Sequence, residues 1–243
     1  MLKKWFLLLL ASLMIFTLAA CSKEEPTPPS NDDPTPSKPV TPPSQSAVVL
    51  AHSGTLQNGA ITWEIYSDGK MTVKGSGAMP DFEEAEDQPW WIQGGSTWLD
   101  RNVQEEDIVL VTSLVIEDGI TALGEYAFAE QLSLTEVTLP STLSSVPVSC
   151  FKNCTKLETV SGGTSLITIE GEAFCGCEAL ESIELASTLT EVGWNAFSEL
   201  RHNSNSDMKL EVRFHGTEAQ WNAITTDFGN TALTGAEVIY VAE

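Results

Sequence analysis

Four cysteines lie close together in the chain and are the side chains best suited to metal or redox chemistry: Cys150, Cys154, Cys175 and Cys177. Four thiolates that converge tetrahedrally bind zinc, and an even number of cysteines in an exported protein suggests disulfides. Cys154 and Cys177 each follow a phenylalanine by three residues and are 23 residues apart, so a repeating fold would place them in register along one edge. We therefore expect neighbouring buried thiols and no metal site, with a Cys154–Cys177 disulfide as the open alternative and Cys175 as the most exposed thiol.

Two other groups of residues could carry chemistry. Catalysis needs a nucleophile, a base and an orienting group, but the three histidines, His52, His202 and His215, belong to no recognisable constellation. The acidic run Asp81–Asp87 could bind calcium, although it lacks the spacing and the glycine of a dedicated loop, so a solvated loop is expected. The sequence thus predicts a protein that is not an enzyme and has no cofactor or metal.

The N-terminus carries the features of a lipoprotein. Residues 1–20 hold two lysines and then an uncharged apolar run that is too short to span a bilayer, which indicates a signal peptide. Residues 18–21, Leu-Ala-Ala-Cys, resemble the lipobox of bacterial lipoproteins, which implies cleavage before Cys21 and acylation of Cys21. The short stretch that follows consists of Lys23, Glu24 and Glu25. It resembles the signal that sends lipoproteins of some Gram-negative bacteria to the outer face of the outer membrane, and the alternative is an ordinary charged linker. We expect an exported, cell-surface protein attached to the outer membrane by lipid alone.

Composition separates a tether from a folded part and limits the partners. Residues 21–47 hold eight of the twelve prolines, and the rest are mostly polar, which predicts a disordered tether. The formal charge of −22 repels phosphate backbones and anionic headgroups, so nucleic acid is not an expected partner. Basic proteins, cations and neutral glycans remain open, and we expect a monomer.

The folded part is a repeat array. Five apolar columns share a step of 23 residues; one of them consists of Phe128, Phe151, Phe174 and Phe197. This period lies in the range of leucine-rich repeats, in which each coil adds one short strand, such as Leu134–Leu139, and buries its apolar edge against its neighbours. The chain should be mainly β with short helical turns, a leucine-rich repeat solenoid. Its expected parts are a signal peptide (1–20), a tether (21–47) and a repeat domain (48–243), divided into an N-terminal cap (48–108), repeats (109–201) and a C-terminal cap (202–243).

Each cap has predicted elements of its own. Alternating apolar residues on either side of an Asp-Gly turn predict a hairpin between 60–66 and 71–74. Three tryptophans follow it and could form a carbohydrate platform: Trp90, Trp91 and Trp98. The C-terminal cap should contain strands at 210–214 and 238–241 and a helix at 217–224.

These motifs resemble the BspA-like leucine-rich repeat surface proteins. The resemblance rests on the hairpin, the segments Gly75–Pro80 and Pro89–Trp90, the repeat pattern, and the tail Gly216–Ile224. It implies that Trp90 packs against the first repeat, and that the protein is a surface-displayed binding or adhesion module. The alternative is a passive structural or accessory subunit of a surface complex. The sequence departs from the family pattern at Gly162–Gly163, where the family has Leu-Pro.

An unidentified protein ligand, from the host or from a bacterial surface, would bind the outward positions of the repeat strands. These positions form a strip rich in Thr and Glu across adjacent strands. Its carboxylates could face basic groups of the ligand, or could only keep the exposed sheet soluble. The predicted binding residues are Thr135, Glu136, Thr138, Glu158, Thr159, Glu181, Ser182 and Glu184.

Overall fold

The computed structural model describes residues 47–93, 96–97, 109–201 and 209–241. The predicted signal peptide, the lipidation site, the export signal and the tether up to residue 46 therefore lie outside the described residues, as do Trp98 and His202.

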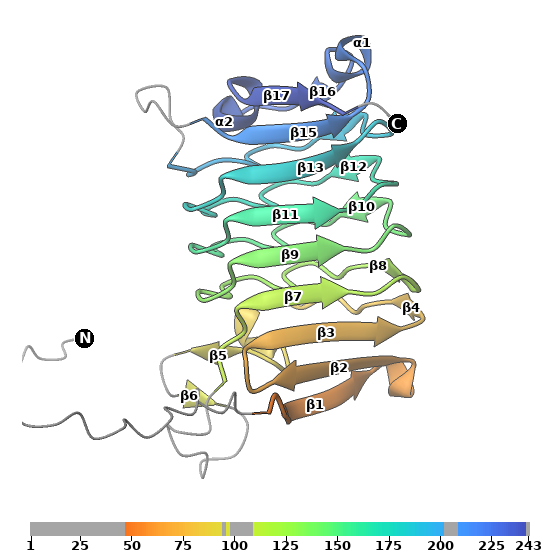
Figure 1. The fold of residues 1–243 in the computed structure, drawn as a ribbon, viewed down its shortest axis with the longest axis vertical. Coiled ribbons are helices and arrows are strands. Elements are labelled where there is room, and N and C mark those ends of the chain that lie inside the picture. The colour runs from red at the N-terminus through yellow and green to blue at the C-terminus, as the bar shows by residue number, and fades with distance from the viewer. Residues whose placement is uncertain (1–46, 94–95, 98–108, 202–208, 242–243) are drawn as a thin grey trace, which may run out of the picture. The chain divides into compact units, whose positions relative to one another are not determined.

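The main element is a nine-stranded sheet that runs along the array (Figure 1). The first three strands pair antiparallel with one another, and all later neighbours pair parallel. In spatial order the strands are β1 (Leu50–Leu56), β2 (Ile61–Tyr66), β3 (Lys70–Gly75), β7 (Ser113–Ile116), β9 (Glu136–Leu139), β11 (Thr159–Gly162), β13 (Ser182–Ala186), β15 (Glu211–His215) and β17 (Glu237–Tyr240).

A second, narrower parallel sheet closes the other side of the coils. Its strands are β10 (Ser145–Val146), β12 (Thr168–Ile169), β14 (Glu191–Val192) and β16 (Thr225–Thr226). Two short pairs join β4 (Gly77–Ala78) to β8 (Ile120–Ala122) and β5 (Ile92–Gln93) to β6 (Ser96–Thr97). The described helices are the 3₁₀ turns η1 (Gln57–Gly59) and η2 (Ala85–Asp87) and the short α-helices α1 (Glu218–Trp221) and α2 (Thr231–Thr234). The fold is thus the predicted mainly-β leucine-rich repeat solenoid.

The strand register confirms the repeat length. Ser113, Glu136, Thr159 and Ser182 are successive Cα partners across β7, β9, β11 and β13, which is a step of 23 residues. Between β13 and β15 the step lengthens, since Ser182 pairs with Glu211.

Stacked aromatic rings form the axis of the core. Phe128, Phe151, Phe174 and Phe197 are each at most 1% exposed. The centroids of successive rings are 5.5, 5.4 and 5.3 Å apart, with interplanar angles of 12°, 3° and 20°. The same step of 23 residues brings the same ring to the same place in each coil. A period in the sequence therefore becomes a continuous stack in the core.

The N-terminal cap extends this stack. Trp90 stacks on Phe128 at 5.4 Å and its indole N–H donates to the Ala127 carbonyl at 3.2 Å. Gln88 donates to the Tyr126 and Ala129 carbonyls at 2.6 and 3.1 Å. The predicted hairpin is confirmed as β2–β3, but β1 was not predicted. The segment of β1 lacks an apolar alternation because it is an exposed edge strand.

The C-terminal cap has both predicted strands, β15 and β17, and its helix, which is shorter than predicted. Thr217 caps α1 by accepting a hydrogen bond from the Gln220 N–H. Asn230 links the cap to the last repeat. Its side-chain oxygen accepts from the Phe197 N–H at 2.9 Å and its amide donates to the Gly193 carbonyl at 2.8 Å. Within the described ranges, no helix has the length and apolarity that crossing a bilayer requires.

Candidate functional site

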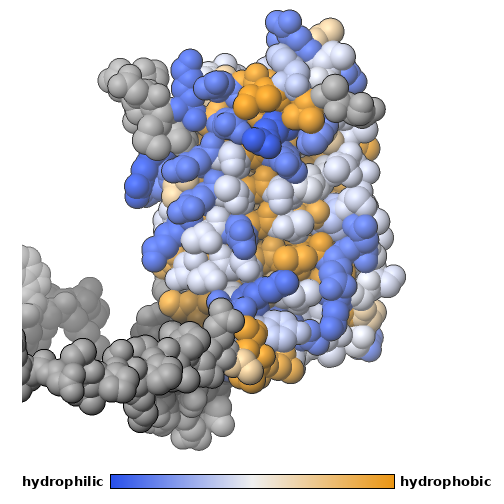
Figure 2. All heavy atoms as spheres, in the orientation of Figure 1, coloured by the Kyte–Doolittle hydropathy of each residue, from blue (hydrophilic) through white to orange (hydrophobic). Residues whose placement is uncertain are grey.

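The predicted binding residues share one surface of the array. We call this surface the strand face; it is the outward side of β9, β11, β13 and β15, together with the residue before each strand. Figure 2 shows it with hydrophilic side chains toward the left and right margins of the view. Glu136, Thr159 and Ser182 are successive Cα partners on this face. One position earlier, the Glu158 N–H donates to the Thr135 carbonyl and the Glu181 N–H to the Glu158 carbonyl, at 2.8 and 2.9 Å. The register thus places Thr135, Glu158 and Glu181 in neighbouring coils, with Thr138 further along β9.

The four carboxylates of this face differ in environment. Glu136, Glu158 and Glu181 are exposed, and no ion pair forms at them with any other described residue. Glu184 is partly buried and accepts a hydrogen bond from the Gly162 N–H at 3.1 Å. The four residues therefore share one face but occupy three register rows, and one of them is already used within the chain.

Arg213 is a residue of this face that the sequence analysis did not single out. It is the Cα partner of Glu184, and its guanidinium donates to the Glu211 carboxylate at 3.0 Å. This hydrogen bond, supported by the charges of Glu211 and Glu184, raises the pKa of Arg213. Its signal in the sequence was the alternation in the predicted strand at 210–214. Arg213 therefore brings a positive charge to the strand face at β15, next to the carboxylates of Glu211 and Glu184.

Gly162 has a conformational reason to replace the leucine of the family pattern. Its φ is +82°, and a Cβ would lie 2.2 Å from the Leu139 carbonyl oxygen. Only glycine fits such a backbone without strain. The close approach to β9 also leaves the Gly162 N–H directed at Glu184.

The four cysteines that the structure describes are all free, buried thiols. Cys154 and Cys177 are fully buried, as predicted, and their thiols donate to the Phe128 and Phe151 carbonyls at 3.1 and 3.2 Å. Cys175 is the most exposed of the four thiols, as expected, but it is still buried. It is 6% exposed, because the next coil covers it and the Ser198 hydroxyl donates to its sulfur at 3.1 Å. Burial raises the pKa of Cys150, Cys175 and Cys177, so these sulfurs are held as thiols.

The other candidates have structural surroundings. Trp90 and Trp91 are buried, so neither offers a surface platform for a carbohydrate. Asp81 and Asp87 accept backbone hydrogen bonds from Glu125 and Glu84, at 2.9 and 3.3 Å. In the described part of the chain, no three His, Cys, Asp or Glu side chains are grouped as metal ligands would be. His52 lies on β1 and His215 ends β15, far apart in the strand order.

Comparisons with known proteins agree with this architecture. A family model described as a BspA type leucine rich repeat region matches residues 107–220 in six copies. A leucine-rich repeat protein from Eubacterium ventriosum has a similar structure, with 23% identity and a TM-score of 0.52 over 76% of this chain and 41% of that one. A leucine rich cell surface protein from Faecalibacterium prausnitzii matches at 21% identity and a TM-score of 0.44, over 73% and 43%. This chain thus spans less than half the length of either, and no curated protein sequence matches it.

Proposed function

We propose that this protein, whose residues 107–220 are a BspA-type leucine-rich repeat region, is a lipid-anchored binding protein of the bacterial cell surface. Its strand face would dock a protein ligand that carries basic groups. The lipobox-like sequence that ends at Cys21 supports the anchor. The likeness to a protein described as a cell surface protein agrees with this location but does not carry it. The chemistry of the strand face is the argument for binding.

The observation that carries the proposal is the set of carboxylates with no partner in the described structure. Glu136, Glu158 and Glu181 are exposed, and their coils are held by the sheet in fixed register. Parallel strands lie about 4.8 Å apart, so Glu158 and Glu181 keep like charges on neighbouring coils. A cationic partner would offset this repulsion, and the Thr and Ser hydroxyls between the carboxylates can both donate and accept hydrogen bonds.

Charge reversal tests the proposal. The chain that begins after Cys21 is used as bait for host matrix and bacterial surface proteins. The association rate of each captured protein is then measured with the double variant Glu136→Lys, Glu181→Lys. We expect slower association at low salt and little change at high salt, since steering by exposed charges is screened.

A matched control separates the strand face from the total charge. Glu125→Lys with Glu191→Lys makes the same change in net charge at exposed positions outside the strand face, one of them on β14. It should leave association close to that of the parent chain. Unchanged binding by the folded Glu136→Lys, Glu181→Lys variant would refute docking on the strand face. Failure to capture any protein would favour the structural or accessory role.

A further inference from the structure

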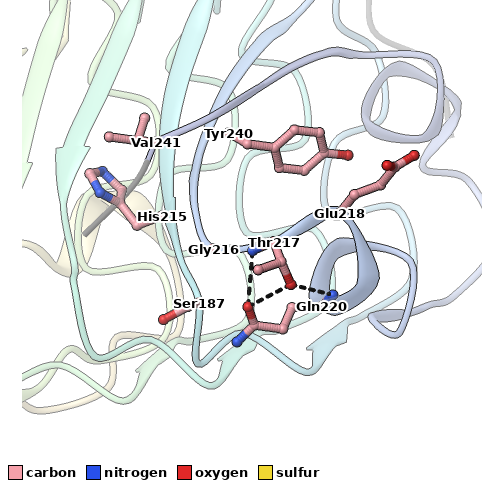
Figure 3. Close-up of a pocket in the computed structure, with 8 residues that line it drawn as sticks. All are labelled: Ser187, His215, Gly216, Thr217, Glu218, Gln220, Tyr240 and Val241. Atoms are coloured by element: carbon pink, nitrogen blue, oxygen red, sulfur yellow. Dashed lines mark hydrogen bonds between the residues drawn. The ribbon is translucent and has the colours of Figure 1, made fainter.

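A pocket lies outside the strand face, where the C-terminal cap meets the last repeat. It has a volume of about 550 Å³, within the range of small-molecule sites. It forms where β13, β15 and β17 end and α1 begins, so three strand ends and the first turn of a helix build its wall (Figure 3). Its lining residues are Ser187, His215, Gly216, Thr217, Glu218, Gln220, Tyr240 and Val241.

One polar group of the pocket is held in a fixed orientation. The Gln220 side-chain oxygen accepts hydrogen bonds from the Thr217 N–H and from the Thr217 hydroxyl, both at 2.9 Å. Because the oxygen is occupied in this way, the amide nitrogen is directed away from Thr217 with its two N–H donors (Figure 3). Gly216 makes this arrangement possible, since a Cβ there would lie 2.7 Å from the Phe214 ring and 3.1 Å from the Gln220 oxygen. The capping of α1 therefore leaves the two N–H donors of this amide unused by Thr217.

The opposite wall is aromatic. Tyr240 is 41% exposed, because it lies on β17, the edge strand of the described sheet. One side of the ring is fixed by edge contact with Phe214, with centroids 6.4 Å apart. In Figure 3 the ring lies between His215 and Glu218, with its hydroxyl turned toward the Glu218 side. A ligand in the pocket would meet an aromatic ring beside groups that can donate and accept hydrogen bonds.

The lining chemistry selects a class of ligand. It contains no lysine or arginine, and the chain carries a formal charge of −22, so phosphate, sulfate and carboxylate ligands are disfavoured. Glu218 is the only carboxylate and it is exposed, which makes an ion pair with an amine weak. Neutral ligands rich in hydroxyl groups fit better. Their hydroxyls can accept from the Gln220 amide and donate to Glu218, while their C–H faces pack on the Tyr240 ring.

We propose that this pocket is a binding site for a neutral sugar. The site is independent of docking on the strand face, because none of its lining residues belongs to the charge-reversal pair of the proposed function. A protein ligand that carries glycans could use both sites, but the two can be tested separately.

Ligand-detected NMR on the chain that begins after Cys21 tests the site. The neutral probes are glucose, galactose, mannose, lactose, maltose and N,N′-diacetylchitobiose, with lysine amide and inorganic phosphate as the charged probes. We expect saturation transfer to at least one neutral sugar and to neither charged probe. No transfer to any neutral sugar, or transfer to lysine amide in preference, would overturn the proposal.

Substitutions then locate the site. Tyr240→Ala should weaken binding at least tenfold, and Glu218→Gln less, while Tyr240→Phe keeps the ring and should retain most of the affinity. Trp194→Ala is the matched control. Trp194 is an aromatic residue that is 40% exposed, and it follows β14, a strand of the second sheet. Circular dichroism checks that each variant is folded. Binding that survives Tyr240→Ala, or that is lost in Trp194→Ala, would place the sugar elsewhere and refute this site.

Discussion

Removing one ring from the aromatic stack should lower the free energy of unfolding nearly as much at the N-terminal end of the stack as in its middle. Phe151 has a stacked ring on each side, at 5.5 and 5.4 Å, and Phe128 does too, because Trp90 lies 5.4 Å from its outer side. An aromatic side chain buries about 150–250 Å², which at about 25 cal/mol per Å² is worth about 4–6 kcal/mol as an upper value. After allowance for the methyl group that remains, Phe151→Ala and Phe128→Ala should each lower the free energy of unfolding by about 3–5 kcal/mol.

Urea unfolding of the chain that begins after Cys21, followed by circular dichroism, measures this cost. The slope of the unfolding free energy with urea is compared first, since a changed slope would mean that the array no longer unfolds as one unit. The double variant Trp90→Ala, Phe128→Ala then isolates the contact between the cap and the first coil, which should contribute about 0.5–1.5 kcal/mol. A cost below about 1 kcal/mol for Phe128→Ala alone would show that Trp90 does not continue the stack. An equally small loss of unfolding free energy in Phe151→Ala would show that the phenylalanine column is not part of the core.

Three further predictions concern the anchor, the thiols and the hairpin. Cys21→Ala should leave an unprocessed precursor without lipid label, and a variant still cleaved and still bound to membranes would contradict the lipobox interpretation. The four buried cysteines should react with Ellman's reagent far more slowly in the native protein than in urea. The protein is not reduced before the assay, so fewer than four reactive thiols in urea would indicate a disulfide. Lys74 donates to Glu64 at 2.9 Å and lowers the pKa of Glu64. This stabilisation is fully present above pH 4.5, the ordinary pKa of the group, and is lost as the pH falls through the lower pKa of Glu64 in the folded protein. The difference in urea midpoint between the parent chain and Glu64→Gln should therefore shrink below pH 4.5.

The repeats were predictable from the sequence because each apolar column reports burial directly. A position that is buried in one coil is buried in the next, so Phe151 and Phe174 predict each other, and the stack follows from the period alone. Gly162 interrupts the pattern without disturbing the core, since what changes there is the path of the backbone.

The caps were predicted less completely because each is built once. Nothing in the sequence of β1 marks it as a strand, since its pairing depends on β2 and on Trp63. The Trp63 ring lies against Gly54 of β1, and a Cβ at Gly54 would come within 2.6 Å of that ring. The environment of Cys175 depends on Ser198 in the following coil. The pocket depends on the strand ends, which meet only in the folded cap. Such features involve residues distant in sequence and have no repeating signal.

The same limit explains why the acidic residues of the strand face looked alike in the sequence and differ in the structure. Glu184 is engaged by the N–H of Gly162, a residue of the preceding coil, and Glu211 by Arg213 on its own strand. Glu136, Glu158 and Glu181 have no such partner in the described structure, so their charge remains available to a ligand. A Glu184→Lys variant would break a hydrogen bond within the fold and place a second cation beside Arg213. Loss of binding in that variant could then come from the fold as easily as from the ligand. Charge reversal at Glu136 and Glu181 avoids this ambiguity, because neither carboxylate forms an ion pair with another residue in the described part of the chain.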